Sequence, residues 1–423
     1  MAKKNNNLVV LDIGGSAIRG AEVSYDRNNV PTIHRIGEVP LKVGVVTNGE
    51  VQSHDALVLA LRELWDTAKF STTELKFGLE STSVSTRSRT EDWISDEDFN
   101  EIITSYAQKL FQIEQANLGN YYYRHHTIAE YVVEETRNRD EDFDMPGEII
   151  PVRKKSVIIA AAEKTIVDAF IAAMHEAKLK PVDIDFNPFA LIRASKRIPR
   201  RIQDAAEVSI DIGSDLITIV IHTERQPIYV RTISGNSGKS MTELIQEELK
   251  VESFGRAEAR KIRIIYSNNI DAERRKQYRS QPSIFAPDDE EEERPNTQEM
   301  QLRLNKQAKD IARIVMQETS KIINATNETL SYYKDRNQRI HRYSHVTLSG
   351  GLAHVPKIVG RMGEELKTHV DISNPFIDVL DDGIRFVDKG TNPELPYPDS
   401  VKGREHLYTT LLGLAIKGGY ENG

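Results

Sequence analysis

An Asp-Ile-Gly sequence occurs twice in this chain of 423 residues, in Val9-Val10-Leu11-Asp12-Ile13-Gly14 and again in Ser209-Ile210-Asp211-Ile212-Gly213. Each copy belongs to an apolar run that turns at glycine and serine and continues into two further extended segments. A helix is expected after each unit, over residues 53–69 and from about Thr242 to Lys250. An internal repeat of this kind predicts two lobes of the same topology.

Strands and helices alternate after each repeat, which indicates a mixed or parallel sheet covered by helices and therefore an α/β fold. The elements expected after the first copy are the strand Val157–Ala161, the helix Thr165–Ala177, the strand Val182–Phe186 and a helix from Phe189. Those expected after the second copy are the strand Val346–Leu348, a helix from about Val355, the strand Val370–Ile372 and a helix near Leu407–Ile416.

The remaining segments are interpreted as insertions into the two lobes. We expect the first lobe in residues 1–80 and 153–204, and the second in residues 205–250 and 345–423. Residues 81–152 predict a small α/β subdomain that contains the helix Asp96–Phe111. Residues 251–344 predict a mainly helical subdomain, with a stripe along one long helix formed by Ile311, Val315, Thr319, Ile322, Ile323, Thr326 and Tyr333. Within it, the acidic loop 281–300 has a composition typical of a solvated segment.

The composition is that of a soluble globular chain, because 39% of the residues are hydrophobic and 28% are charged. The formal net charge of −8 gives no general reason to expect nucleic-acid binding. The absence of cysteine excludes disulfides, thiolate metal ligands and cysteine nucleophiles. The polar start Met1–Asn7 does not predict a secretory signal, and no apolar run approaches the roughly 20 residues of a membrane helix. We therefore expect contact with a membrane only through a partner.

The two Asp-x-Gly turns predict nucleotide binding. A carboxylate at the end of a buried strand, followed by glycine, places an oxygen ligand beside a backbone that phosphates can approach closely. We expect the β- and γ-phosphates of ATP between two turns, which are formed by Asp12, Gly14, Gly15 and Ser16 and by Asp211, Gly213 and Ser214. Two facing aspartates also suit a hydrated Mg²⁺ ion. The alternative for either turn alone is an ordinary β-turn, in which Asp and Gly are common.

A third motif, Ser349-Gly350-Gly351-Leu352, connects a strand to a helix and exposes backbone on which a ligand can lie. Because it follows the second repeat, we assign it to the same site. Two other patterns are not nucleotide motifs. The run Gly235–Ser240 ends like a P-loop, but Ile233 stands at the first glycine position, so a helix entry near Ser240 or Thr242 is expected. The first Asp-Ile-Gly turn is followed by a strand, whereas a Rossmann fingerprint leads into a helix.

Taken together, the motifs resemble those of the actin-like ATPase superfamily. Asp12–Glu22 looks like its first phosphate motif, Asp211–Val220 like its second, and Leu348–Ile358 like its adenosine motif. Asn187–Ala190 and Gly413–Ala415 look like the two connectors between the lobes. The segment Ala257–Lys261 resembles the helix whose Glu and Lys contact ribose and adenine in many members.

This resemblance covers nearly the whole chain and implies a two-lobed actin-like (ribonuclease H-like) ATPase fold with inserted subdomains. It implies that Arg19, Glu258 and Lys261 join the ATP-binding residues of the three motifs. It also makes Asp12 and Asp211 the candidate catalytic residues and the candidate ligands of Mg²⁺, through water.

Within this superfamily the chain is most similar to the PilM family of type IV pilus assembly proteins. The similarity is carried by Val157–Ala161, Val167–Phe170, Ala177–Asp185 and Phe189–Ala194. It implies a cytoplasmic ATP-binding protein that is attached to the inner membrane by a partner protein. A homo-oligomer is compatible with this resemblance. That partner is expected to be an inner-membrane protein of the PilN type, whose N-terminal cytoplasmic peptide binds in a groove involving the inserted subdomain. The related protein FtsA usually ends in an amphipathic membrane-binding helix, which Ile416–Gly423 does not predict.

Two departures from the family pattern bear on mechanism. Several superfamily members place an acid in the first connector to orient the attacking water, where this chain has Asn187-Pro188, so we expect slow hydrolysis or none. Thr90–Ser95 differs from the apolar Leu-Pro-x-Met pattern of PilM proteins, which changes the expected details of the partner groove. The expected function is a nucleotide-regulated scaffold, with a small-molecule kinase or an FtsA-like filament-forming protein as alternatives.

Overall fold

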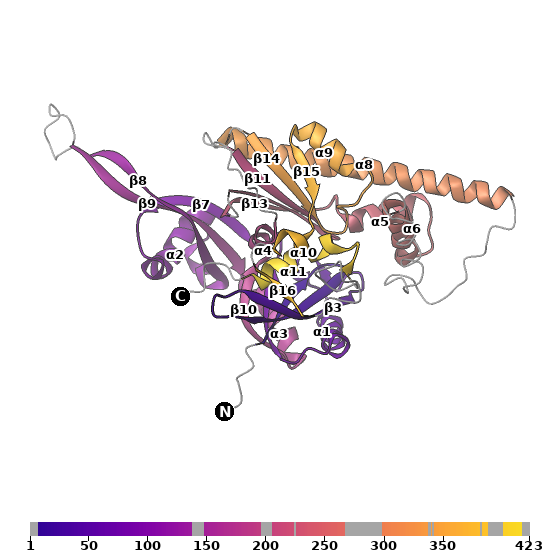
Figure 1. The fold of residues 1–423 in the computed structure, drawn as a ribbon, viewed down its shortest axis with the longest axis horizontal. Helices are drawn as coiled ribbons and strands as arrows, with labels where there is room; N and C mark the ends of the chain where they lie inside the picture. Colours follow the sequence, from indigo (N-terminus) through magenta and orange to yellow (C-terminus); the bar gives the residue numbers. More distant parts are fainter. Residues whose placement is uncertain are drawn as a thin grey trace.

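The computed structural model describes residues 7–137, 148–195, 205–223, 226–266, 298–336, 340, 342–380, 383–387 and 401–416. Two large sheets carry helices on their faces and form the two lobes, and a third sheet projects from them as a long ribbon (Figure 1). Within these ranges, no helix has both the length and the hydropathy of a membrane span.

The first lobe is built on a six-stranded sheet with the order β10-β6-β1-β2-β3-β16. Its strands are β1 (Leu8–Ile13), β2 (Ala17–Tyr25), β3 (Pro31–Pro40), β6 (Glu74–Leu79), β10 (Lys180–Phe186) and β16 (Arg385–Phe386). A short hairpin of β4 (Val46–Thr47) and β5 (Glu50–Val51) precedes α1 (His54–Ala68). The apolar stripes of α1 and α3 (Lys164–Glu176) form one core with β1 and β6, in which Leu61, Phe77 and Phe170 are buried.

The second lobe has a five-stranded sheet with the order β13-β12-β11-β14-β15. Its strands are β11 (Ala205–Ile212), β12 (Leu216–Thr223), β13 (Gln226–Ser234), β14 (Arg342–Ser349) and β15 (His369–Ile372). The helices of this part are α5 (Gly238–Glu248), α6 (Phe254–Tyr266), α8 (Gln298–Arg336) and α9 (Ile358–Leu366). The predicted stripe of α8 is confirmed, because all seven of its residues are buried and its apolar members pack into the core of this lobe.

The two sheets share one topology, which confirms the internal repeat. In each, an antiparallel meander (β1-β2-β3 or β11-β12-β13) is extended on one side by two parallel strands (β6 and β10, or β14 and β15). The sequence did not predict β16, which pairs in parallel with β3 and returns the last part of the chain to the first lobe. The residue limits given above for the two lobes and the two insertions stay a prediction.

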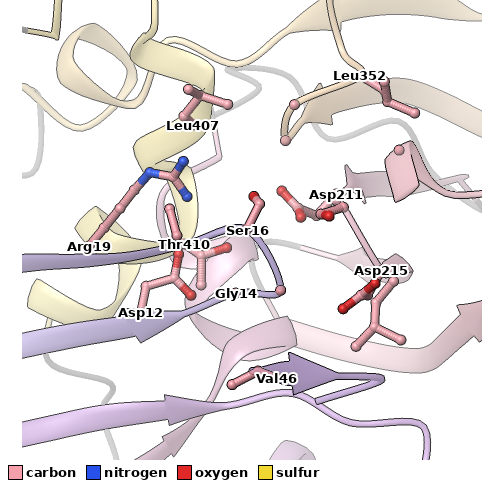
Figure 2. A pocket seen from close by; sticks show the side chains of 18 of the residues that line it. Asp12, Gly14, Ser16, Arg19, Val46, Asp211, Asp215, Leu352, Leu407 and Thr410 are labelled. Atoms are coloured by element: carbon pink, nitrogen blue, oxygen red, sulfur yellow. The ribbon is translucent and has the colours of Figure 1, made fainter. Parts of the chain in front are cut away.

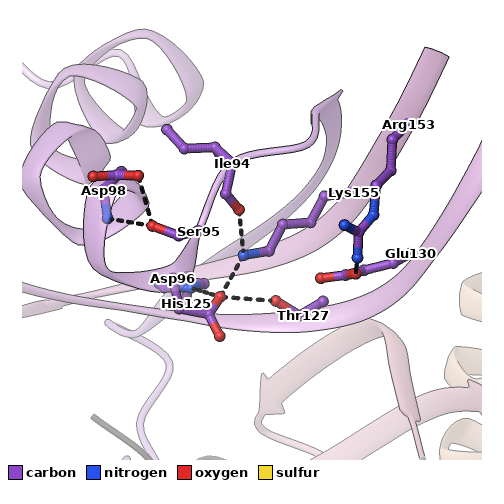
Figure 3. A network of polar contacts seen from close by, with 9 residues as sticks. All are labelled: Ile94, Ser95, Asp96, Asp98, His125, Thr127, Glu130, Arg153 and Lys155. Carbon is purple, nitrogen blue, oxygen red and sulfur yellow. Dashed lines mark hydrogen bonds and ion pairs between the residues drawn. The ribbon is translucent and has the colours of Figure 1, made fainter.

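The third sheet, with the order β7-β9-β8, belongs to the inserted subdomain. It consists of β7 (Ser85–Asp92), β8 (Tyr121–Arg137) and β9 (Glu148–Glu163), accompanied by α2 (Asp96–Phe111) and the 3-10 helix η1 (Gln115–Asn120). The predicted helix Asp96–Phe111 is confirmed, and Ser95 caps it by accepting a hydrogen bond from the Asp98 N–H over 3.1 Å. The buried Lys155 donates to the Ile94 carbonyl over 3.1 Å and to the Asp96 carboxylate, which ties β9 to the start of α2 (Figure 3).

One predicted strand lies in a different sheet from the one expected. Val157–Ala161 was assigned to the first lobe, but it is part of β9, the central strand of the inserted sheet. Its residues Val157 and Ile159 pack against Phe99 of α2. A central strand with both faces covered reads as a continuous apolar run, as does a parallel strand of a lobe, so the pattern does not distinguish the two. The strand that extends the first lobe beside β1 is β6.

Most other predicted elements begin and end within a few residues of the observed ones. α5 begins at Gly238, earlier than expected, because Ser237 and Ser240 form a capping box there. Residues 281–297 of the predicted acidic loop 281–300 lie outside the described part of the chain. The last three residues of that range belong to α8, which begins at Gln298. Residues 417–423, for which no membrane-binding helix was expected, also lie outside the described part.

The two predicted connectors are short helices that pack against each other between the lobes. They are α4 (Asn187–Arg193) and α11 (Thr409–Ala415); α10 (Pro375–Asp378) and the 3-10 helix η4 (Glu405–Tyr408) precede α11. Their backbones approach so closely that a side chain at Gly413 would place its Cβ 1.8 Å from the Ala190 carbonyl oxygen. Arg193 Nε also donates to the Gly413 carbonyl over 2.9 Å. Glycine is therefore required at this crossing.

Gly413→Ala is expected to lower the free energy of unfolding by about 3 kcal/mol, because its methyl group would overlap the Ala190 backbone. The matched control is Gly360→Ala on the exposed part of α9, where no described neighbour lies within 4 Å of the added methyl group. That change is expected to raise stability by about 0.5–1 kcal/mol. Urea unfolding measures both, and equal stabilities of the two variants would contradict a tight crossing.

Candidate functional site

A pocket lies between the lobes where β1 and β11 end (Figure 2). It is lined by all the predicted nucleotide-binding residues except Ser349, namely Asp12, Gly14, Gly15, Ser16, Arg19, Asp211, Gly213, Ser214, Glu258, Lys261, Gly350, Gly351 and Leu352. Ser349 is buried behind the wall, and its hydroxyl donates to Asp211 Oδ1 over 2.7 Å. The structure thus brings the three motifs together, while the role of each residue stays a prediction.

The two Asp-x-Gly turns have the same backbone hydrogen bond. The Gly14 N–H donates to the Ala17 carbonyl over 3.0 Å, and the Gly213 N–H donates to the Leu216 carbonyl over 2.9 Å. In the third motif, Gly350 has a φ of +82°, and a Cβ there would lie 2.6 Å from the Ile212 carbonyl oxygen. Only glycine fits this position, so bare backbone forms the wall.

The carboxylates of Asp12 and Asp211 lie on opposite sides of the pocket, with Ser16 between them (Figure 2). Burial raises the pKa of Asp12 to about 6; the charge of Arg19 lowers it, and the charge of Asp211 raises it. Burial also raises the pKa of Asp211, although the hydrogen bond from Ser349 and the charge of Arg19 oppose this. Protein groups alone therefore compensate these two negative charges poorly, which is the situation that a bound cation relieves.

Glu258 and Lys261 reach the pocket wall from α6, but they are bonded to their surroundings. Lys261 Nζ donates to the Gly238 carbonyl, the Thr242 hydroxyl and Glu258 Oε2, each over 2.7 Å. An ammonium group has three donors, so all of them are used within the protein. Lys261 braces α6 against the start of α5, and a contact with a ligand requires it to give up one of these bonds.

The opposite side of the pocket is closed by a network around Glu38. Arg19 Nη2 donates to Glu38 Oε1 over 2.9 Å, while Glu38 Oε2 accepts from Arg404 and, over 3.0 Å, from the Tyr408 hydroxyl. Burial raises the pKa of Glu38, but the charges of Arg19 and Arg404 outweigh it and hold the pKa below its ordinary value. Arg19 thus places a positive charge near Asp12. The sequence did not point to Arg404.

Three acids of the pocket were missed by sequence reasoning, namely Glu38, described above, Glu80 and Asp215. Glu80 follows β6, whose Gly78 lies opposite Asp12 on β1, and its carboxylate accepts a hydrogen bond from Thr218 of the other lobe. Burial, and next the charge of Asp211, raise its pKa. Asp215 lies in the same turn as Asp211, 3.8 Å from Lys239 Nζ, and burial raises its pKa as well. A carboxylate at the end of a strand would have been the signal for Glu80, but the strand Glu74–Leu79 was not predicted.

The pocket's apolar part lies away from Asp12. Leu352 and Leu407 lie on that side (Figure 2), and Ile262, Ile265 and Tyr266 of α6 also line the pocket. Such a surface suits a flat base. The pocket thus combines an apolar wall with a polar, glycine-lined floor.

The charges of the pocket fit a nucleotide only together with a divalent cation. The lining residues include six acids (Asp12, Glu38, Glu80, Asp211, Asp215 and Glu258) and three bases (Arg19, Lys261 and Arg404), a formal charge of 3 − 6 = −3. A free triphosphate would meet repulsion here, whereas Mg²⁺ prefers carboxylate and phosphate oxygens and bridges the two. The residues present therefore fit MgATP better than ATP alone.

Replacing Asp12 by Asn tests this electrostatic account. The pKa of Asp12 is raised from 3.8 to about 6, so its ionisation lowers the stability of the ligand-free protein as the pH rises through this range, by up to about 3 kcal/mol. Asp12→Asn keeps the shape and can still accept the hydrogen bond that Asn187 donates over 3.2 Å. We expect the variant to be more stable than the original near neutral pH and equally stable at about pH 4. Urea unfolding without nucleotide measures this, and a less stable variant near neutral pH would contradict it.

Residues 142–276 match the family model described as type IV pilus assembly protein PilM. This range contains the first connector and the Asp211 turn, but not Asp12 or the third motif. No curated protein sequence matches the chain.

Several solved structures match this chain over most of its length. A structure described as the PilM-PilN type IV pilus biogenesis complex is 18% identical over 97% of each chain, with a TM-score of 0.67. The ethanolamine utilization protein EutJ from Carboxydothermus hydrogenoformans is 13% identical over 99% of this chain and 92% of its own, with a TM-score of 0.49. MreB5 of Spiroplasma citri bound to AMPPNP is 11% identical over 90% of this chain and 96% of its own, with a TM-score of 0.43. The protein has the two-lobed actin-like ATPase fold, which it shares with the PilM-PilN structure over nearly the whole chain, and its predicted resemblance to the PilM family of type IV pilus assembly proteins is confirmed by the family model over residues 142–276.

Proposed function

We propose that this protein binds MgATP between its lobes and recruits the N-terminal cytoplasmic peptide of an inner-membrane pilus protein of the PilN type. It acts in the cytoplasm as a scaffold of type IV pilus assembly and reaches the membrane only through that partner. The observation that supports nucleotide binding most directly is the pair of carboxylates with raised pKa values, the buried Asp12 and the partly buried Asp211, on opposite sides of the pocket.

In this proposal the phosphates lie between the turns Gly14-Gly15-Ser16 and Gly213-Ser214, which line the pocket from the two lobes. Asp12 and Asp211 hold the hydrated Mg²⁺, which neutralises the phosphate charge when bound. The base lies on the apolar wall beside Leu352, and the Glu258 side of α6 lies beside the ribose.

The partner is proposed from the fold shared with the PilM-PilN structure, and the inserted subdomain supports it. This subdomain carries large apolar side chains that are exposed, namely Trp93, Ile102, Tyr122, Val132 and Ile149. Exposed apolar side chains of this size can contribute to a protein interaction surface. The sheet β7-β9-β8 also offers strand edges to which an extended peptide can add.

Glu80 supports a second candidate function, the transfer or hydrolysis of a phosphoryl group. The first connector lacks an acid, but Asn187 at that place is hydrogen-bonded to both Asp12 and Glu80. A buried carboxyl group with a raised pKa is a suitable proton acceptor. We still propose the scaffold function, because the Glu80 carboxylate already accepts hydrogen bonds from Thr218 and Asn187 in the structure. ADP release that depends on added sugars and is lost in Glu80→Gln would favour a kinase instead.

MgATP is expected to raise the stability of the protein by about 2.7 kcal/mol at a concentration a hundred times its Kd. Asp12→Asn and Asp211→Asn are expected to abolish most of this gain, since each removes a charge that faces Mg²⁺. Thermal unfolding with MgATP, with ATP plus EDTA, and without nucleotide measures the effect. Lys178→Ala, on the loop before β10 and away from the pocket, is the control that should keep the full gain. An equal gain in both Asn variants would overturn the proposed site.

Val132→Glu is expected to weaken binding of the partner's N-terminal peptide by about tenfold or more, because it puts a charge on the apolar surface of the inserted subdomain. Leu59→Glu is the matched control: Leu59 and Val132 are both 64% exposed, but Leu59 lies on α1 of the first lobe. Fluorescence anisotropy of a labelled synthetic peptide measures both affinities. If Leu59→Glu weakened binding and Val132→Glu did not, the peptide site would have to be sought on the first lobe.

A further inference from the structure

Three potential metal ligands gather at the edge of the second lobe's sheet, away from the nucleotide pocket. His345 on β14 and His369 on β15 are partners in the parallel register, and Asp371 follows two residues after His369, on the same face of β15. One ligand atom from each residue lies within 4.8 Å of those from the other two. None of the three lines the pocket described above.

The distances between these ligand atoms suit a tetrahedral metal ion. His369 Nε2 lies 2.9 Å from Asp371 Oδ1, and His345 Nε2 lies 3.6 Å from Asp371 Oδ2. Zn–N and Zn–O distances of about 2.0–2.1 Å place two tetrahedral ligands about 3.4 Å apart, which falls between the two observed values. Rotation of the exposed His369 and the partly exposed Asp371 side chains can adjust these distances.

The backbone under these residues is held firmly, while the site stays accessible. β14 is paired on both sides, with β11 and with β15, and His345 is buried. The side chain of His369 is 68% exposed and that of Asp371 is 35% exposed, so an ion can enter from solvent. Glu207 on β11 lies opposite His345 in the register and adds a further carboxylate to this part of the sheet.

From this arrangement we propose that His345, His369 and Asp371 bind one Zn²⁺ ion. Two imidazole nitrogens with one carboxylate favour zinc over Mg²⁺ or Ca²⁺, which prefer oxygen ligands. Three protein ligands leave a fourth position for water or for a donor side chain of another molecule. The ion would fasten the edge strand β15 to β14.

A second group of possible ligands provides a control within the same chain. His54, Asp55 and Glu176 also come within 4.8 Å of one another, but none of the three is buried. They lie at the start of α1 and the end of α3, and no residue of this group is fixed in the centre of a sheet. Zinc bound nonspecifically by exposed groups would therefore depend on His54 as much as on His369.

The test uses the whole protein, treated with a chelator and titrated with Zn²⁺ or Co²⁺ in the absence of nucleotide. We expect one ion per chain and, with Co²⁺, the strong visible absorption of a tetrahedral site. His369→Ala is expected to weaken Zn²⁺ binding by about 100-fold and Asp371→Asn by about tenfold. The His369 side chain is largely exposed and that of Asp371 is partly exposed, so both variants should fold. A thermal stabilisation by MgATP equal to that of the original protein would confirm that each variant is folded.

His54→Ala should keep the full affinity and the cobalt spectrum. Loss of both in His369→Ala, with both retained in His54→Ala, would support the site. The reverse pattern, equal affinity in His369→Ala and the original protein, or no bound ion at all would overturn it.

Discussion

The arrangement of the pocket depends on one backbone contact, the crossing of α4 and α11. Gly413 of α11 lies against the Ala190 carbonyl of α4 with no room for a side chain. Arg193, which is also on α4, donates a hydrogen bond to the Gly413 carbonyl. α4 begins with Asn187, which bonds to Asp12, and a Cβ at Gly78 would lie 1.7 Å from Asn187 Oδ1. The position of the polar floor relative to both lobes is therefore set by how closely two connector helices pack.

The buried acids of this protein fall into two kinds. The Asp185 side chain is only 13% exposed, and burial raises its pKa, but the charges of Arg193 and Lys76 outweigh that effect and lower it. Asp12, Asp211 and Glu80 have raised pKa values, because burial and mutual repulsion exceed what Arg19, Ser349, Thr218 and Asn187 supply. Asp185 thus contributes to structure at neutral pH, whereas the other three are carboxylates that the fold leaves undercompensated. Groups of the second kind gather at binding sites more often than elsewhere.

The sequence predicted the parts of the fold that rest on short-range patterns. The repeated Asp-Ile-Gly turn revealed the two lobes, and helical periodicity located α1, α2, α3 and α8, because each buries one apolar face. What it missed depends on long-range pairing. Val157–Ala161 could not be placed in the right sheet, since an apolar run does not encode its partner strands. Glu80 and Arg404 lie outside any turn motif. They reach the pocket only because β6 pairs with β1 and because the segment before η4 lies beside Glu38 of β3.

The route from the pocket to the inserted sheet is short. β6 ends at Leu79, Glu80 lies in the pocket, and β7 of the inserted sheet begins at Ser85. Glu80 is also bonded to Thr218, so it joins the first lobe to the second at the base of this segment. A ligand can shift a conformational equilibrium only through contacts that differ between the two states. In the proposed complex, Mg²⁺ and phosphate beside Asp12 and Asp211 would change the electrostatic potential at Glu80, and with it the strength of the hydrogen bond from Thr218. Because only four residues separate Glu80 from Ser85, the start of β7, a movement of Glu80 would reach the inserted sheet by a short covalent route.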